Sequence, residues 1–198
     1  SAGTFSYSSV SGQDSWQESS KIGTYASNIY LLDGNQPQIF KHRASGNNFD
    51  TGESYFKSED VQAFGEVLTM AIDGWFYILK KDLSMIKFFA SPAYRVESLS
   101  LNNLPKNYDY DGESSVFLIT RTDLKYVYMY LNKKIWIFEP NTPNYVNTKS
   151  LTYVGQIEWW EEEMTWFYVK ADGNIFVSNK NGVYELDFQI SDGKLIVQ

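Results

Sequence analysis

Two columns of apolar positions recur along the chain, each followed by polar residues. The first column is aromatic and lies at the centre of a short apolar segment, with spacings of 47, 51 and 48 positions: Tyr30, Tyr77, Tyr128 and Phe176. The second column is aliphatic, follows a polar turn, and has spacings of 47, 49 and 48 positions: Ile39, Ile86, Ile135 and Val183. Two independent columns with one period indicate an internal repeat, and each repeat contains two strands joined by a turn.

Each repeat carries further strand candidates on both sides of this pair. Preceding strands are expected at about residues 20–24, 66–72, 116–121 and 165–170. Two of them run into the tight-turn pairs Asp73-Gly74 and Asp172-Gly173, where glycine supplies a positive φ. Fourth strands are expected near residues 54–57, 96–101, 149–154 and 194–197. Residues 45–48 are expected to form a connecting loop, and no segment shows a helical period of useful length.

This pattern predicts an all-β protein of the β-propeller type with four blade repeats of about 48 residues. The blades are expected at about residues 20–60, 61–114, 115–160 and 161–198. Residues 1–19 break the period and contain seven serines, so they are expected to form a Ser-rich strand or connection. One four-stranded sheet cannot bury both faces, so the blades must stack around an axis. Four repeats fit either a four-bladed ring or most of a larger propeller.

Composition narrows the functional classes. The net charge of −7 repels a phosphate backbone, which argues against nucleic acid as a partner. The chain has no cysteine, so neither disulfides nor thiolate metal sites hold the fold. It contains no apolar run of 18 residues, so we expect no direct membrane insertion of this segment. Phosphate-binding loops and hydrolase or zinc-protease motifs do not occur, so we expect no cofactor and no catalytic constellation.

The only histidine is His42, in the strand end Lys41-His42-Arg43. Two cationic neighbours disfavour a charged imidazole and do not resemble a catalytic triad. We expect an ordinary surface or edge residue.

Residues 107–113 resemble the first half of a calcium loop. The candidate oxygen ligands are Asn107, Asp109 and Asp111, followed by a glycine, as in the start of such a loop. The position for the bidentate glutamate holds Leu118. A turn between blades is therefore favoured over a calcium site.

Residues 158–163 combine two tryptophans with four glutamates. Tryptophan offers a large flat contact area and is enriched at binding hot spots, although a hairpin tip whose tryptophans fold back on the blade explains the pattern as well. The candidate partner-contacting residues are Trp159, Trp160 and Trp75, with Tyr108 and Tyr110 next.

Five stretches resemble a group of uncharacterised bacterial β-propeller regions. They are residues 12–16 (GQDSW), 25–33 (YASNIYLLD), 70–80 (MAIDGWFYILK), 121–128 (RTDLKYVY) and 133–138 (KKIWIF). In that group the propeller follows a membrane segment and a domain resembling the metal-dependent serine/threonine phosphatases. The resemblance spans about residues 12–188 and implies a place in the bacterial envelope, outside the cytoplasm. A cytoplasmic location is the alternative, because the lack of cysteine fits a cytosolic protein and an exported one equally. Its motifs are strand and turn residues, so no phosphatase activity carries over. A four-bladed ring would also resemble hemopexin-like domains, which usually close with a disulfide that this chain cannot form.

The sequence therefore favours a non-catalytic scaffold that recognises a protein or a glycan, since propeller loops vary freely on a rigid frame. One alternative is a carbohydrate-active enzyme with paired carboxylates such as Glu161 and Asp111, which would have to lie about 5–10 Å apart in a cleft. Another is a structural subunit of a surface assembly, which would carry a large apolar contact face.

Overall fold

The computed structural model describes residues 8–11, 19–33, 38–56, 64–89, 95–142, 147–159, 163–186, 188–191 and 194–197. The regular structure of these residues consists of strands, without an α-helix, which confirms the predicted all-β class. None of the described segments is a helix long and apolar enough to cross a membrane. The chain divides into two compact units, Ser1–Val67 and Leu68–Gln198, and each is described by itself.

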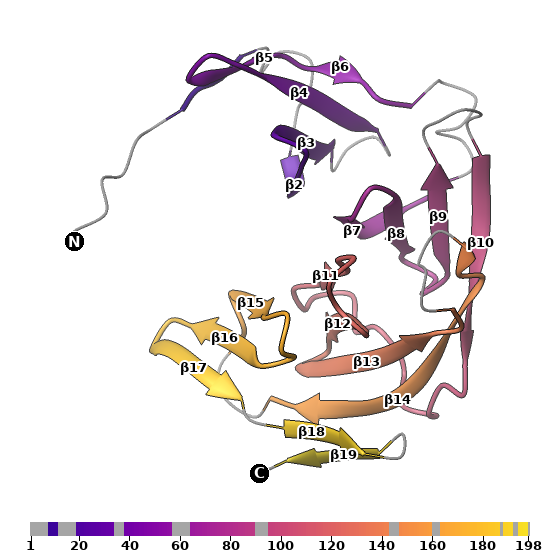
Figure 1. The fold of residues 1–198 in the computed structure, drawn as a ribbon. Coiled ribbons are helices and arrows are strands. Elements are labelled where there is room, and N and C mark those ends of the chain that lie inside the picture. Colours follow the sequence, from indigo (N-terminus) through magenta and orange to yellow (C-terminus); the bar gives the residue numbers. More distant parts are fainter. Residues whose placement is uncertain are drawn as a thin grey trace. The chain divides into compact units, whose positions relative to one another are not determined.

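The first unit is built around the antiparallel strands β2, β3 and β4 (Figure 1). Its strands are β1 (Val10–Ser11), β2 (Ser19–Tyr25), β3 (Asn28–Asp33), β4 (Ile39–Ser45), β5 (Asn48–Thr51) and β6 (Glu53–Ser54). Strand β6 pairs with the first part of β4 and β5 with its end, while β1 lies parallel to β5. The expected loop at residues 45–48 is instead a hairpin turn in which Ser45 pairs with Asn48, because Gly46 takes a positive φ of 61°. We call β2, β3, β4 and β6 meander 1.

The second unit contains three antiparallel meanders (Figure 1). Meander 2 consists of β7 (Val67–Ile72), β8 (Phe76–Lys80), β9 (Met85–Phe89) and β10 (Arg95–Asn102). Meander 3 consists of β11 (Phe117–Ile119), β12 (Val127–Leu131), β13 (Lys134–Pro140) and β14 (Ser150–Glu158). Meander 4 consists of β15 (Trp166–Val169), β16 (Ile175–Asn179) and β17 (Gly182–Leu186). The last strands of meanders 2 and 3 pair in parallel, Ser100 with Ser150 and Asn102 with Thr152.

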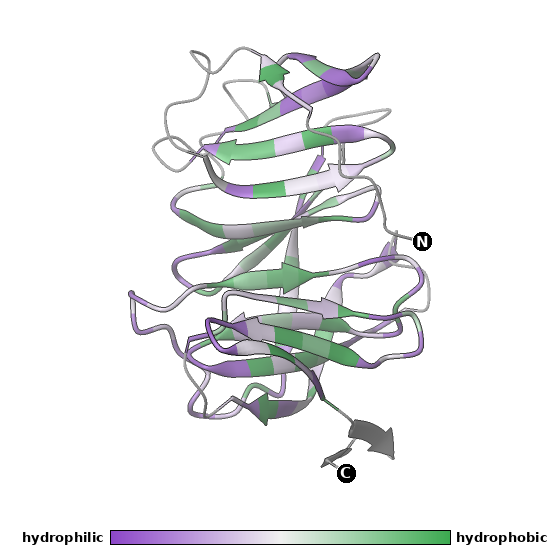
Figure 2. Ribbon diagram, turned by 90° about the vertical axis from the view of Figure 1, so that its left-hand side faces the viewer, coloured by the Kyte–Doolittle hydropathy of each residue, from purple (hydrophilic) through white to green (hydrophobic). Residues whose placement is uncertain are grey.

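Meander 3 is buried on both faces. Along β12, Val127, Met129 and Leu131 belong to a cluster shared with meander 2. The alternate residues Tyr128 and Tyr130 belong to a second cluster, shared with meander 4. Successive side chains of a strand point to opposite faces, so a continuous apolar run serves two layers. Hydrophobic residues accordingly concentrate in the strands and hydrophilic ones in the turns (Figure 2).

Two strand assignments from the sequence need correction. The expected fourth strand of the last repeat, β19 (Lys194–Val197), pairs with β18 (Phe188–Ser191) in a separate hairpin and does not extend meander 4. In the aliphatic column, Ile86 is out of register: it pairs with Ile78, whereas Met85 pairs with Leu79. A shift of one residue moves a side chain to the other face. The blade boundaries stay a prediction.

His42 is also not a surface or edge residue. Its side chain is fully buried in β4, and its Nδ1 atom donates to the backbone oxygen of Asp50 at 2.9 Å. Because a carbonyl oxygen only accepts, the proton lies on Nδ1. The backbone of Gly52 packs directly against the imidazole, which leaves no room for a β-carbon there.

Candidate functional site

Strand β15 places two large aromatic side chains in solvent. Its residues alternate between exposed and buried: Trp166 and Tyr168 are 48% and 41% exposed, whereas Phe167 and Val169 are in the core. The exposed rings lie in nearly parallel planes, with an angle of 8° and 6.0 Å between centroids. The strand therefore presents a rigid aromatic pair, held by its alternate residues in the buried cluster.

The other two strands of meander 4 extend this surface. Tyr168 lies opposite Phe176, and Trp166 lies opposite Ser178. On β17, Glu185 lies opposite Phe176, and Val183, which is 67% exposed, lies opposite Ser178. Residues directly opposite in an antiparallel pair share one face of the sheet. We call this face the aromatic face; it comprises Trp166, Tyr168, Phe176, Ser178, Val183 and Glu185.

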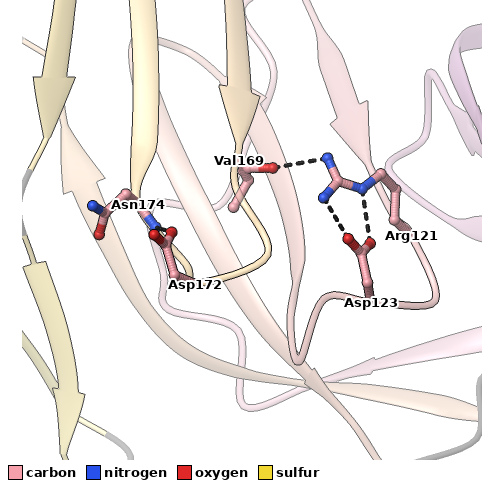
Figure 3. Close-up of polar contacts among 5 residues, drawn as sticks. All are labelled: Arg121, Asp123, Val169, Asp172 and Asn174. Atoms are coloured by element: carbon pink, nitrogen blue, oxygen red, sulfur yellow. Dashed lines mark hydrogen bonds and ion pairs between the residues drawn. The ribbon is translucent and has the colours of Figure 1, made fainter.

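Arg121 holds one end of the aromatic face. Its Nε and Nη2 atoms donate to the carboxylate of Asp123 at 2.8 Å each, and Nη1 donates to the backbone oxygen of Val169 at 2.9 Å (Figure 3). Its guanidinium carbon lies 5.1 Å from the centroid of the Tyr168 ring. The hydrogen bonds to Asp123 raise the pKa of Arg121 and lower that of Asp123, so both stay charged. The turn before β12 is thereby tied to β15.

A second cation borders the same end. Lys170 lies with its Nζ atom 4.5 Å from the centroid of the Phe176 ring and 3.8 Å from Glu185 Oε1. Asn174 donates to the same Glu185 oxygen at 3.1 Å. The backbone N–H of Asn174 donates to the carboxylate of Asp172 at 3.0 Å (Figure 3). The aromatic face thus combines flat rings with charged and amide groups at one border.

Two of the residues proposed from the sequence as partner contacts pack against other side chains of the second unit. Trp159 is a core residue, 5% exposed, with its ring 5.6 Å from that of Tyr184. Tyr108 packs edge-on against Trp136 at 5.1 Å and donates to the sulfur of Met129 at 3.3 Å; burial raises its pKa.

The remaining proposed contact residues are half-buried or not described. Trp75 and Tyr110 are half-buried and pack against the cluster between meanders 2 and 3. Trp160 and Glu161 lie outside the described residues. The sequence shows a row of aromatic residues, but which face is covered depends on the neighbouring meander.

The calcium-like segment is tied to the hairpin turn between β12 and β13. Asn132 donates to Asp109 Oδ1 at 3.2 Å and accepts from the backbone of Asp111 at 3.1 Å. The carboxylate of Asp111 accepts from Glu113 N and Ser114 N at 2.9 Å each, and from Ser114 Oγ at 2.5 Å, and these bonds lower its pKa. Asn107 lies in the same loop. Within the described ranges, no three His, Cys, Asp or Glu residues come together as a metal site.

A buried polar cluster lies where meander 2 meets meander 3. Thr120 donates to the carboxylate of Asp73, and burial raises the pKa of this carboxyl. Lys87 is fully buried, with its Nζ atom 5.7 Å from the centroid of the Tyr77 ring, and burial lowers its pKa. These buried polar side chains therefore support the contact between meanders 2 and 3.

Sequence reasoning missed Trp166 and Tyr168, which were part of an expected strand at residues 165–170. The sequence gives only a weak indication of their exposure: in Trp166–Val169 the residues on both faces of the strand are large and apolar. Such a pattern predicts a strand covered on both faces, and exposure of one face is a property of the assembled sheets.

Comparison with family models finds no match, and neither does comparison with curated proteins. Among solved structures, a protein from Lactobacillus plantarum aligns with 91% of this chain and 54% of its own, at a TM-score of 0.51 and 11% identity. A protein from Bacteroides uniformis, provisionally assigned as a 6-phosphogluconolactonase, aligns with 92% of this chain and 56% of its own, at a TM-score of 0.54 and 11% identity.

A functionally unknown protein from Desulfotomaculum acetoxidans aligns with 87% of this chain and 51% of its own, at a TM-score of 0.50 and 13% identity. At such identities the likeness concerns the fold alone. The chain spans about half the length of each of these three structures.

Proposed function

We propose that this chain is a four-blade β-propeller region that recognises a partner protein through the aromatic face and catalyses no reaction itself. The observation that carries the proposal is the parallel, half-exposed pair Trp166 and Tyr168. Tryptophan, tyrosine and arginine are the residues most enriched at protein-binding hot spots, and Arg121 completes this set next to Tyr168.

The rigidity of the surface supports recognition. Phe167 and Val169 anchor β15 in the core. Arg121, held by two hydrogen bonds to Asp123, fixes the end of β15 through one hydrogen bond to the backbone oxygen of Val169. A surface whose side chains are already ordered loses little conformational entropy on binding. The blade interpretation rests on the repeat of antiparallel meanders, and the envelope location rests on the resemblance to bacterial propeller regions.

The test compares binding by the wild-type chain and by the double variant Trp166→Ala/Tyr168→Ala. Both proteins are immobilised and exposed to a bacterial envelope protein fraction and, separately, to neutral and charged oligosaccharides. A protein ligand retained by the wild type should be lost by the variant, because alanine removes both contact rings.

The matched control is Leu104→Ala/Tyr25→Ala, which removes two other side chains that are 38% and 44% exposed. It should retain the ligand. Equal binding by all three proteins would contradict the proposal. Retention of oligosaccharides instead of protein would move the assignment to glycan recognition.

A further inference from the structure

Two of the three rings on the aromatic face lie next to a cation of the chain itself. The guanidinium carbon of Arg121 lies 5.1 Å from the centroid of the Tyr168 ring. The Nζ atom of Lys170 lies 4.5 Å from the centroid of the Phe176 ring. A cation within about 6 Å of an aromatic centroid is attracted by the negative face of the ring. The chain's own charges therefore already occupy these two positions of the face.

The third ring, that of Trp166, has no such cation among the residues that the structure describes. It contacts the nearly parallel ring of Tyr168 and is 48% exposed. Tryptophan attracts cations more strongly than tyrosine or phenylalanine does. Arg121 is bound at Val169, the last residue of β15, whereas Trp166 is the first residue of this strand. The ring with the strongest attraction for a cation therefore remains exposed, at the other end of β15 from Arg121.

The sequence around the aromatic face is acidic. Residues 158–187 contain seven acidic and two basic residues, so this segment contributes −5 to the net charge of −7. One of its two basic residues, Lys170, is paired with Glu185 at 3.8 Å, and that pair adds no net charge to the face. A negatively charged surface attracts cationic groups and repels anionic ones. The charge of this region therefore complements a basic partner.

A fixed carboxylate precedes the exposed ring. Glu163 stands three residues before Trp166. Its Oε1 atom accepts from the hydroxyl of Ser115 at 2.8 Å and from the Ser115 backbone N–H at 3.1 Å. The hydroxyl bond, followed by the backbone bond, lowers the pKa of Glu163, so its carboxylate stays charged at neutral pH. The segment that enters β15 thus carries a negative charge and then the flat indole ring.

We infer that the partner of the aromatic face is a basic protein segment that places an arginine side chain on the ring of Trp166. The inference rests on the proposed recognition role of the aromatic face and names the chemistry of its partner. Arginine fits better than lysine, because a planar guanidinium stacks on an aromatic ring while its N–H groups donate to a carboxylate. Arg121 already combines these two contacts within the chain, since it lies next to the Tyr168 ring and donates to Asp123.

The test uses a short peptide with blocked ends in which arginine alternates with glycine. The peptide is titrated into the full chain, and binding is followed by NMR. The indole Nε1–H signal of Trp166, identified by its absence in Trp166→Leu, should move during the titration. A second peptide carries citrulline, which keeps the planar shape of arginine without its charge. Its dissociation constant should be at least about threefold higher, because a neutral group loses the attraction to the ring.

Substitution of Trp166 separates the ring from the general acidity of the chain. Trp166→Leu removes the aromatic ring, keeps an apolar side chain and leaves every charge in place. It should raise the dissociation constant of the arginine peptide about three- to tenfold, whereas Trp166→Phe, which keeps a ring, should raise it less. Tyr25→Leu is the matched control, since it replaces another aromatic residue that is 44% exposed, and it should leave the constant unchanged. Circular dichroism should show a wild-type fold for all three variants, because both residues are exposed.

Equal binding of the arginine peptide by the wild type and by Trp166→Leu overturns the inference. Equal binding of the arginine and citrulline peptides also overturns it, and so does a wild-type chain that binds neither. These failures are separate from failure of the proposed function. A protein ligand may be lost on Trp166→Ala/Tyr168→Ala while the peptide titration is the same for the wild type and Trp166→Leu. That combination contradicts the arginine contact and supports recognition by the aromatic face.

Discussion

At the scale of single residues, a buried polar side chain restricts which residue can stand next to it. His42 is surrounded by cationic neighbours in sequence, yet its ring is enclosed in the first unit and packs against the backbone of Gly52. Its Nε2 atom has no hydrogen-bond partner among the described residues. A glycine is required opposite this ring because any β-carbon would overlap it.

Gly52→Ala should therefore lower the free energy of unfolding by about 1–3 kcal/mol, the range for overpacking a core site. The measurement is urea denaturation followed by circular dichroism. In a His42→Ala background the ring is absent, so the same substitution should cost much less. If Gly52→Ala lowered the free energy of unfolding equally in the two backgrounds, the overlap of the alanine with the His42 ring would not be the cause.

Burial also makes a tyrosine sensitive to alkaline pH. Tyr128 is 2% exposed, and desolvation raises its pKa above the ordinary value of 10.0. The unfolded chain therefore ionises first, and the folded state binds more protons once the pH exceeds that value. Stability from this residue is complete below pH 10 and is lost as the pH rises. Tyr128→Phe should reduce the loss of stability between about pH 9 and pH 11, measured as the shift in urea midpoint. If the urea midpoint of Tyr128→Phe shifted with pH as much as that of the wild type, ionisation of Tyr128 would not be the cause of the loss.

At the scale of elements, β15 is an edge strand of meander 4 and depends on contacts from outside its own sheet. Arg121 supplies such a contact by bridging Asp123 and the backbone of Val169 (Figure 3). A planar guanidinium makes these bonds simultaneously, which the single ammonium group of lysine cannot do.

Arg121→Lys should loosen β15 without unfolding the second unit. We expect a stability loss of about 1 kcal/mol, since the ion pair is partly exposed. Amide hydrogen exchange in residues 166–169 should become faster than in the wild type. Exchange in β12, which lies between two buried clusters, should remain slow. An equal acceleration in β12 would indicate global destabilisation instead of local loosening.

At the scale of the whole molecule, meander 3 links two hydrophobic clusters. Trp136 belongs to the cluster shared with meander 2, and the next residue, Ile137, belongs to the cluster shared with meander 4. Trp136 is fully buried and donates from Nε1 to the backbone oxygen of Leu131 at 3.1 Å. Stacked repeats gain stability from such neighbour contacts.

Damage to either cluster should destabilise the same cooperative transition of the second unit. Trp136→Ala should cost about 3–5 kcal/mol and Ile137→Ala about 2–5 kcal/mol. Both variants should lower the midpoint temperature of a single calorimetric transition, because β13 supplies both residues. A separate transition for meander 4 in either variant would contradict the coupling through meander 3.

The sequence alone determined the all-β class, the repeated strand pairs and most strand positions. These follow from local alternation and turn residues, which depend on near neighbours in the chain. It could not determine the register at Ile86, which depends on how the turn between β8 and β9 closes, or the pairing of β19 with β18. It also could not separate exposed from buried aromatic residues. Trp159 is buried and Tyr108 is half-buried against a neighbouring strand, while Trp166 and Tyr168 lie on a face that the described chain leaves exposed. Tertiary structure decides this because burial depends on which sheet packs on which face, and alternation along one strand is the same in both cases.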